Sequence, residues 1–109
     1  MNKSIRTNQL DRIVKRLVER FHPDEIILFG SHARGTAGPD SDYDLLVVTR
    51  VTGSRRAMRV KMRLAVHDLG IPIDVVVATR DEVETQRNIP GTLIRSAVQE
   101  GRPLYAGTP

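Results

Sequence analysis

Residues 25–48 read EIILFGSHARGTAGPDSDYDLLVV. Two apolar runs in this stretch, residues 25–29 and 45–48, are typical of buried β-strands. The first run ends at Gly30 and Ser31, where a glycine and a hydroxyl begin a turn whose backbone N–H groups can face an anion. Before the second run come Asp42 and Asp44, whose i, i+2 spacing puts both carboxylates on one face of a strand, about 6.6 Å apart along it. The stretch therefore predicts a phosphate pocket that faces a pair of carboxylates.

The two aspartates indicate a cation. Like charges brought together at the start of an apolar strand are unfavourable unless a cation offsets them, and Mg²⁺ is usually held by one or two carboxylates together with substrate phosphates. A third carboxylate is expected from a neighbouring strand, and Asp74 is the one charged residue in the apolar stretch 71–78. By itself Asp74 also fits an edge-strand residue that faces solvent. Alongside the pair, it completes a predicted metal and catalytic set of Asp42, Asp44 and Asp74.

Two better-known motifs are excluded. Asp40, Asp42 and Asp44 resemble the start of an EF-hand loop, but the sixth position is Leu45 instead of glycine and the twelfth is Val51 instead of glutamate. Residues 30–35 have the spacing of a P-loop, but the next residue is threonine instead of lysine. Taken alone, residues 35–40 are typical of a turn and a polar connection.

The spacing of Gly30-Ser31, ten residues, Asp42-Tyr43-Asp44 and a later strand aspartate resembles the DNA polymerase β-like nucleotidyltransferase superfamily. The short chain is similar to its minimal nucleotidyltransferase (MNT) branch, and the resemblance runs from about Ile13 to Tyr105. It implies that Gly30, Ser31 and Arg34 bind the nucleotide and that Asp42, Asp44 and Asp74 hold two Mg²⁺ ions. An arginine on a short exposed turn is as often simply solvated, so Arg34 has that second interpretation. His32 departs from the pattern, since relatives often carry arginine or a small polar residue there, and its role stays open.

The resemblance also implies an activity. We expect Mg²⁺-dependent transfer of a nucleoside monophosphate, AMP from ATP, onto a hydroxyl group. MNT proteins resemble the antitoxin halves of pairs with HEPN-domain ribonuclease toxins, which they can adenylylate on tyrosine, so a HEPN-domain protein encoded nearby is the expected partner. One alternative is a partner-binding antitoxin module without catalysis. Another is a homodimeric nucleotidyltransferase acting on small molecules or RNA ends.

Periodicity predicts the fold class. Apolar residues from Leu10 to Phe21 recur at helical spacing, with Asn8 as a possible cap, and His22-Pro23-Asp24 ends that helix. Further helices are predicted from Ser54 to about Leu69, after the capping box that begins at Thr79, and over residues 93–100, stopped by Gly101 and Pro103. Strands are expected over residues 25–29, 44–49 and 73–78. We therefore predict one minimal nucleotidyltransferase domain, residues 1–109, of the α/β class, with a three-stranded mixed sheet flanked by about four helices.

Composition sets further bounds. The 109 residues contain no cysteine, which excludes disulfides and thiolate zinc sites. The three histidines lack the spacing of a metal motif. The beginning of the chain has no apolar signal region and no run reaches about 20 apolar residues, so we expect a cytoplasmic protein. The formal net charge is +4, and Arg55, Arg59 and Arg63 form a stripe that either docks an acidic protein or an RNA acceptor, or is a solvated helix face.

Overall fold

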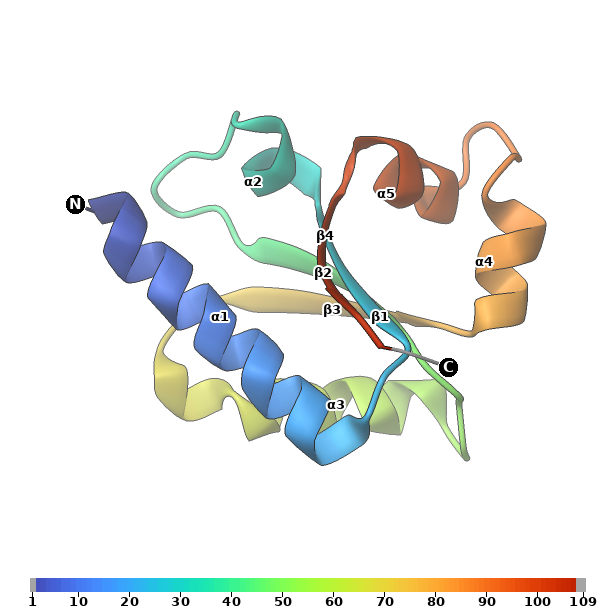
Figure 1. The fold of residues 1–109 in the computed structure, drawn as a ribbon, viewed down its shortest axis with the longest axis horizontal. Coiled ribbons are helices and arrows are strands. Elements are labelled where there is room, and N and C mark those ends of the chain that lie inside the picture. The colour runs from blue at the N-terminus through green and yellow to red at the C-terminus, as the bar shows by residue number, and fades with distance from the viewer. Residues whose placement is uncertain (1, 108–109) are drawn as a thin grey trace.

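The computed structural model describes the backbone of residues 2–107 and the side chains of residues 9–107 (Figure 1). The predicted α/β class is confirmed, and helices and strands follow one another along the chain. The elements are α1 (Asn2–Phe21), β1 (Glu25–Phe29), α2 (Gly30–Arg34), β2 (Tyr43–Val48), α3 (Arg55–Ala65), the 3₁₀ helix η1 (His67–Leu69), β3 (Ile73–Ala78), α4 (Arg80–Gln86), α5 (Leu93–Glu100) and β4 (Arg102–Ala106).

The sheet has the strand order β3-β2-β1-β4. Strand β1 pairs antiparallel with both β2 and β4, while β2 pairs parallel with β3, so the predicted mixed sheet is confirmed. The predicted number of three strands is wrong, because the described part of the chain adds β4 at the edge beside β1.

Strand β4 is not predicted from the sequence, because Gly101 and Pro103 are typical of residues that end a helix. Gly101 is indeed the C-cap of α5, but the chain then turns directly into β4. Pro103 lacks a backbone N–H and is therefore tolerated in a strand mainly at a sheet edge, which is where β4 lies. The pairing register also shifts, since Ile26 pairs with Tyr105 and Ile27 with Pro103. A proline and a bulge in five residues leave no alternating pattern to recognise.

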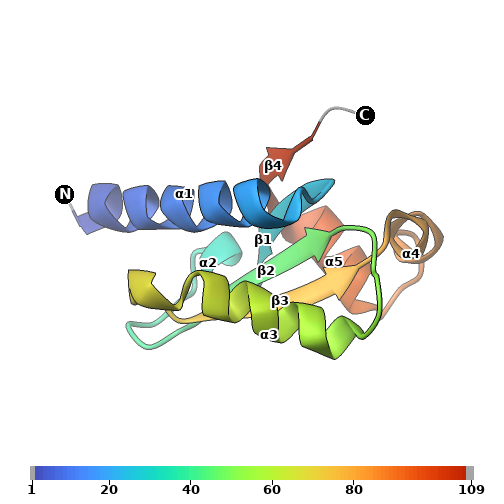
Figure 2. The same cartoon turned by 90° about the horizontal axis from the view of Figure 1, so that it is seen from below.

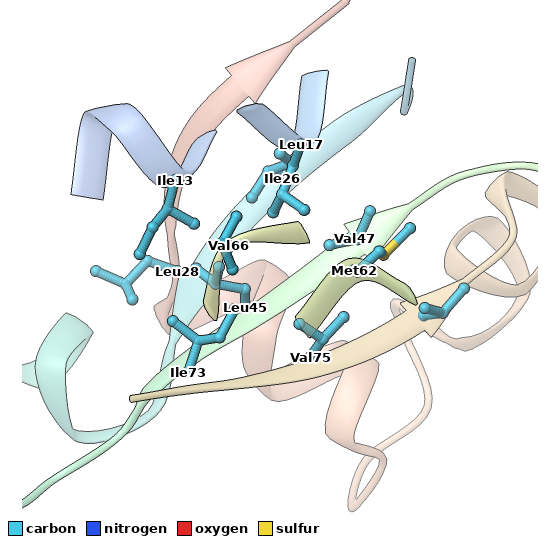
Figure 3. Packing of buried hydrophobic residues seen from close by; sticks show 11 residues of the cluster. Ile13, Leu17, Ile26, Leu28, Leu45, Val47, Met62, Val66, Ile73 and Val75 are labelled. Carbon is cyan, nitrogen blue, oxygen red and sulfur yellow. The ribbon is translucent and has the colours of Figure 1, made fainter. Parts of the chain in front are cut away.

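Two groups of helices cover the two faces of the sheet (Figure 2). Helices α1 and α3 bury one face, and Figure 3 shows the side chains that pack there. This cluster contains Ile13, Leu17, Ile26, Leu28, Leu45, Val47, Met62, Val66, Ile73, Val75 and Val77. Helices α4 and α5 cover the other face through a smaller cluster of Ile27, Leu46, Val48, Ala78, Val83, Ile94 and Ala97. The alternation of β1 and β2 residues between the two clusters shows that both faces of the central strands are buried.

Two predicted helix boundaries are corrected. Helix α1 already begins at Asn2, so Asn8 lies inside the helix and is not its cap. No glycine or proline interrupts residues 2–21, and an asparagine in a helix interior costs less than about 0.7 kcal/mol, so nothing stops the helix from extending. The helix predicted to reach Leu69 is divided into two helices. Helix α3 ends at Ala65, and the tighter 3₁₀ helix η1 covers His67–Leu69. Gly70 caps η1 with a left-handed φ of 71°.

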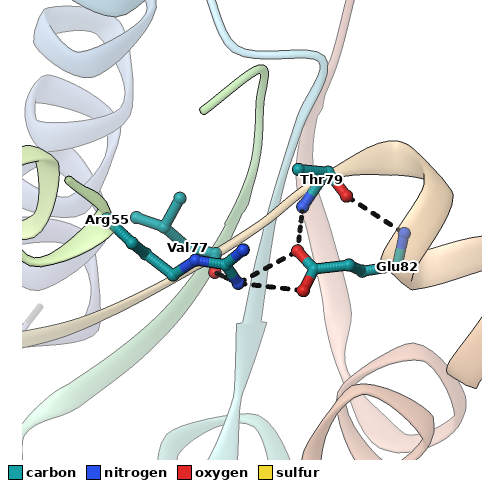
Figure 4. A network of polar contacts seen from close by, with 4 residues as sticks. All are labelled: Arg55, Val77, Thr79 and Glu82. Atoms are coloured by element: carbon teal, nitrogen blue, oxygen red, sulfur yellow. Dashed lines mark hydrogen bonds and ion pairs between the residues drawn. The ribbon is translucent and has the colours of Figure 1, made fainter. Parts of the chain in front are cut away.

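The predicted helix start at Ser54 and the predicted capping box at Thr79 are confirmed. The Ser54 hydroxyl accepts the Ala57 N–H, and Thr79 and Glu82 form the reciprocal capping box. Arg55 links the two helix starts, because it donates to Val77 O at 3.2 Å and to the Glu82 carboxylate (Figure 4). The backbone N–H of Thr79 and the Arg55 guanidinium hold the pKa of Glu82 below its usual value. Among the described residues, no helix is both long and apolar enough to cross a membrane.

Gly101 lies in close contact with the end of α5 and with β1. A Cβ built there would collide with Ala97 O and would lie 2.6 Å from Ile27 Cγ2 and 2.9 Å from Leu28 O. We expect Gly101→Ala to lower the free energy of unfolding by at least 1–3 kcal/mol, roughly the cost of overpacking a core. Gly38→Ala is the matched control, because its Cβ would meet nothing closer than Ser41 Oγ at 3.9 Å. Equal urea midpoints for the two variants would contradict this packing.

Candidate active site

The predicted carboxylates lie at the end of the sheet where β1 ends and β2 and β3 begin. Asp44 in β2 is paired with Asp74 in β3, and its partner on the other side is Phe29 at the end of β1. Residues at the same register in neighbouring strands point to the same face of the sheet. The structure therefore brings Asp44 and Asp74 side by side.

The carboxylates share the face that carries α4 and α5. Phe29 packs against the smaller core cluster on that face, so its partners Asp44 and Asp74 point the same way. Asp42 lies just before β2, in the loop of residues 35–42, and is exposed. Two carboxylates thus stand on rigid strands, and the third stands on a loop.

Gly30 closes the site from the other side. It is the first residue of α2, directly after β1, and has a φ of 74°, a left-handed conformation that favours glycine. A Cβ at this position would collide with Asp44 Oδ2. Glycine is therefore required here twice, by its backbone conformation and by the close approach of a carboxylate.

The environment of Asp44 raises its pKa above the usual 3.8. The main cause is burial, followed by the negative charges of Asp74 and then Asp42, while His32 and Arg34 act in the opposite direction. Asp42 is therefore close enough to Asp44 to influence its ionisation. The three carboxylates form one electrostatic group, and a cation placed among them would be stabilising.

Among residues 9–107, the structure has no group of three or more His, Asp or Glu side chains placed so that they could hold a metal ion. The Asp44–Asp74 pair can still take part in a Mg²⁺ site, because Mg²⁺ commonly takes only one or two carboxylates and completes its coordination with water and substrate phosphates. A mutually repelling pair on adjacent strands, with a third carboxylate nearby, supplies the hard oxygen donors such an ion prefers. The residues present therefore fit the expected ion.

A groove of about 520 Å³ adjoins Gly30. One wall comes from the end of β1 and from α2, with Phe29, Gly30 and Arg34, and the other from the start and outer side of α5. The residues on the second wall are Gly91, Thr92, Leu93, Arg95, Ser96, Gln99 and Glu100. The Arg34 and Glu100 side chains approach to 4.0 Å across the groove, and each is about half exposed.

The sequence alone did not indicate that α5 contributes to the site. Its apolar residues predict a packing helix, and Ile94 and Ala97 do pack in the core. Arg95 and Ser96 reach the groove because α5 returns the chain to the edge of β1, a placement that depends on β4. The predicted nucleotide residues are brought to this region together: Gly30 and Arg34 line the groove, and Ser31 lies between them in α2.

The chain resembles known proteins in sequence and in fold. The family model described as "Nucleotidyltransferase domain" matches residues 10–105. A curated relative from Methanocaldococcus jannaschii, named "Putative protein adenylyltransferase MJ1305", is 42% identical over 64 residues, which make up 57% of this chain and 44% of that protein. The matched segment thus spans less than half of that relative.

Solved structures share the fold. A toxin–antitoxin crystal structure with AMP-PNP has a TM-score of 0.55 at 23% identity, covering 90% of this chain and 74% of that chain. A crystal structure of a mutant of the toxin–antitoxin MntA–HpeT has a TM-score of 0.53 at 20% identity, with coverages of 90% and 73%. At these identities the likeness concerns the fold.

The raised pKa of Asp44 can be tested by measuring the thermal stability of the protein as a function of pH. Because burial and the neighbouring charges raise the pKa of Asp44, its ionised form destabilises the folded state, and this penalty is absent at low pH and grows as the pH rises past 3.8. We expect Asp44→Asn to keep or raise the melting temperature at pH 7 in metal-free buffer, and the gain to shrink toward pH 3.

Asp68→Asn is the control, because the pKa of Asp68 is shifted in the opposite direction to that of Asp44. The Asp68 carboxylate accepts a hydrogen bond from Arg16, which lowers its pKa, so its removal should reduce stability at pH 7. A clear loss of stability in Asp44→Asn would show instead that Asp44 is a structural residue.

Proposed function

The chain belongs to the nucleotidyltransferase domain family, as its sequence resemblance indicated, and we propose that it transfers AMP from ATP to a hydroxyl group. The observation that carries this proposal is the position of Asp44. It is held between Asp74 on the neighbouring strand and Gly30 at the start of α2, beside a groove large enough for a nucleotide. The proposal treats residues 1–109 as one minimal nucleotidyltransferase domain.

The groove receives the donor nucleotide. Gly30 lets the backbone at the start of α2 approach the triphosphate, and the Ser31 hydroxyl donates a hydrogen bond to it. Arg34 faces the same groove and supplies positive charge to the phosphates. Because its contact with Glu100 is long and half exposed, little free energy is lost when the guanidinium turns toward a phosphate. These donors orient the β- and γ-phosphates so that pyrophosphate leaves in line with the attacking oxygen.

The carboxylates organise the reacting atoms. Two Mg²⁺ ions bound by Asp42, Asp44 and Asp74 would supply charge neutralisation of the phosphates and a more acidic acceptor hydroxyl. Asp74 lies on the strand beyond Asp44 and accepts the proton of the acceptor hydroxyl at its carboxylate as the oxygen attacks the α-phosphorus. The new bond joins the acceptor oxygen to phosphorus, and the bond that breaks releases pyrophosphate.

The acceptor comes from a second protein. The M. jannaschii relative is named for protein adenylyltransferase activity, and the two solved structures described above are toxin–antitoxin assemblies. These names support a protein acceptor and a toxin–antitoxin context. The resemblance to MNT antitoxins adds the finer part of the proposal: the acceptor is a tyrosine hydroxyl of a HEPN-type toxin, and the outcome is neutralisation of that toxin in the cytoplasm. A binding module that neutralises its partner by occlusion, and a homodimeric enzyme acting on small molecules or RNA ends, are the alternatives that experiment must separate.

Turnover distinguishes an enzyme from a binding module. With ATP and Mg²⁺, substoichiometric amounts of this protein should add the mass of AMP to the co-encoded HEPN-type protein, as measured by intact mass spectrometry. The partner should stay inhibited after the two proteins are separated. Asp44→Asn and Asp74→Asn should lose at least 10²-fold in rate, since an amide is a poor ligand for Mg²⁺ and a poor base. Asp68→Asn should keep the wild-type rate. Protection only at equimolar amounts, without ATP and equally by Asp44→Asn, would favour the binding module.

The basic stripe on α3 is a candidate docking surface for the partner. Arg59 and Arg63 are exposed beside Val60 and Leu64, whose exposed fractions are 48% and 67%. Arg55 differs, because it is tied to Glu82 and to Val77 O and so has a structural role. Helix α3 contains five basic and no acidic residues, RRAMRVKMRLA, so an acidic partner surface would relieve its repulsion.

Charge reversal tests this surface. We expect the double change Arg59→Glu and Arg63→Glu to weaken binding of the HEPN-type protein at least tenfold in surface plasmon resonance, with an effect that diminishes as salt increases. Arg12→Glu with Lys15→Glu on α1 changes the net charge equally at exposed positions and should have a smaller effect. If the two double changes weaken partner binding equally, the basic stripe on α3 is only a solvated helix face.

A further inference from the structure

The loop that carries Asp42 has little structure of its own. Residues 35–42 contain Gly35, Gly38 and Pro39 and form neither helix nor strand. Its start is bonded to α2, because Thr36 N–H donates to Ser31 O at 3.0 Å. Beyond that, Gly38 N–H donates to Ser41 Oγ at 2.9 Å, and Ser41 N–H donates to Gly38 O at 3.2 Å, so these two bonds stay within the loop. Glycines widen the range of backbone conformations that a loop samples. An exposed aspartate at the end of such a loop needs another contact to stay in one place.

His32 makes contacts on both sides of Asp42. Its Nε2 lies 2.9 Å from the carbonyl oxygen of Ser41, and its ring stacks on Tyr43 with a centroid distance of 3.8 Å and an interplanar angle of 10°. A carbonyl oxygen can only accept, so Nε2 carries the proton and donates. The residues immediately before and after Asp42 are therefore held by one side chain.

The same side chain belongs to a fixed element. His32 lies in α2, whose first residue, Gly30, is pressed against Asp44. Tyr43 is fixed independently, because its N–H donates to Pro72 O at 3.0 Å and its neighbour Asp44 is within the sheet. The ring of His32 thus joins the helix that faces the nucleotide to the loop and strand that carry the carboxylates.

We propose that His32 is a positioning residue, which holds Asp42 beside Asp44 through its hydrogen bond to Ser41 and its stacking on Tyr43. The inference rests on the proposed function in one respect, the role of Asp42 toward the Mg²⁺–nucleotide complex. It also accounts for the residue type. The position needs both a flat ring and an N–H in the plane of that ring, and histidine supplies the two together, whereas phenylalanine lacks the donor and glutamine lacks the ring.

Hydrogen exchange of the nucleotide-free protein tests the contact itself. In His32→Ala, amides of residues 36–43 should exchange about five- to tenfold faster than in the wild type, which corresponds to losing a hydrogen bond and a ring stack. His32→Phe and His32→Gln keep one contact each and should fall between. Tyr43→Phe keeps the stack and should resemble the wild type, whereas Tyr43→Leu should resemble His32→Gln. His67→Ala, at an exposed histidine of η1, is the matched control and should change nothing in this loop.

Calorimetry with Mg²⁺ and AMP-PNP tests what the contact is for. His32→Ala should raise the Mg²⁺ concentration needed for half-maximal AMP-PNP binding by about three- to tenfold, the effect of misplacing one ligand without removing it. His32→Phe should recover part of this change. Asp42→Asn sets the upper limit, and in that background His32→Ala should add little, because both changes act through the same ligand.

The outcomes separate the two proposals. Unchanged loop exchange in His32→Ala would overturn the positioning role. Faster exchange with an unchanged Mg²⁺ requirement would also overturn it, because the loop would then be held for a reason unrelated to Asp42. A wild-type protein that binds no AMP-PNP at any Mg²⁺ concentration would refute the proposed function, and the exchange data alone would then decide whether His32 fixes the Asp42 loop.

Discussion

The parallel pairing of β2 with β3 is the constraint on which the site depends. It places Asp44 opposite Asp74 in register, so two like charges must stand side by side wherever the sheet forms. Their repulsion is outweighed by the burial further along the same strands, where Leu45, Leu46 and Val75 are completely buried and each contributes about 1.5–3 kcal/mol. The apolar part of the sheet thus stabilises a carboxylate pair that would not assemble by itself.

The location of the pair at the strand ends follows from the two cores. Starting from the end that carries the site, both faces of the central strands are covered from Leu28 on β1 and Leu45 on β2 inward, which leaves no room for an ion between sheet and helices. At the end of the sheet, the short α2 and the start of α5 stand apart and leave the groove. Glycine is needed at residue 30 because the Asp44 carboxylate occupies the space that a Cβ would fill there.

Local signals in the sequence predicted most of the fold and named the residues that the structure gathers at the candidate site, while the chemical roles of these residues stay predictions. Strands β1 and β3 match the predicted ranges, the helix predicted from Ser54 starts there, and the capping box at Thr79 is formed as expected. Features set by distant parts of the chain were not predictable in this way. Strand β4 exists because it pairs with β1 some 80 residues earlier, and the α5 wall of the groove depends on that return. The tie between Arg55 and Glu82 likewise joins residues 27 positions apart and removes one arginine from the predicted stripe.

The loss of folding stability caused by the crowded carboxylates favours catalysis over simple binding. A module that neutralises a partner by occlusion needs surface charge and shape, which α3 already offers at the other face of the sheet. Such a binding module does not require an aspartate whose pKa is raised by burial and by two neighbouring carboxylates. Nor does it require a glycine with a left-handed φ in close contact with that aspartate. The crowded carboxylates destabilise the ligand-free fold, and bound cations would relieve their repulsion. A negatively charged pocket beside a groove therefore fits the proposed metal–nucleotide substrate.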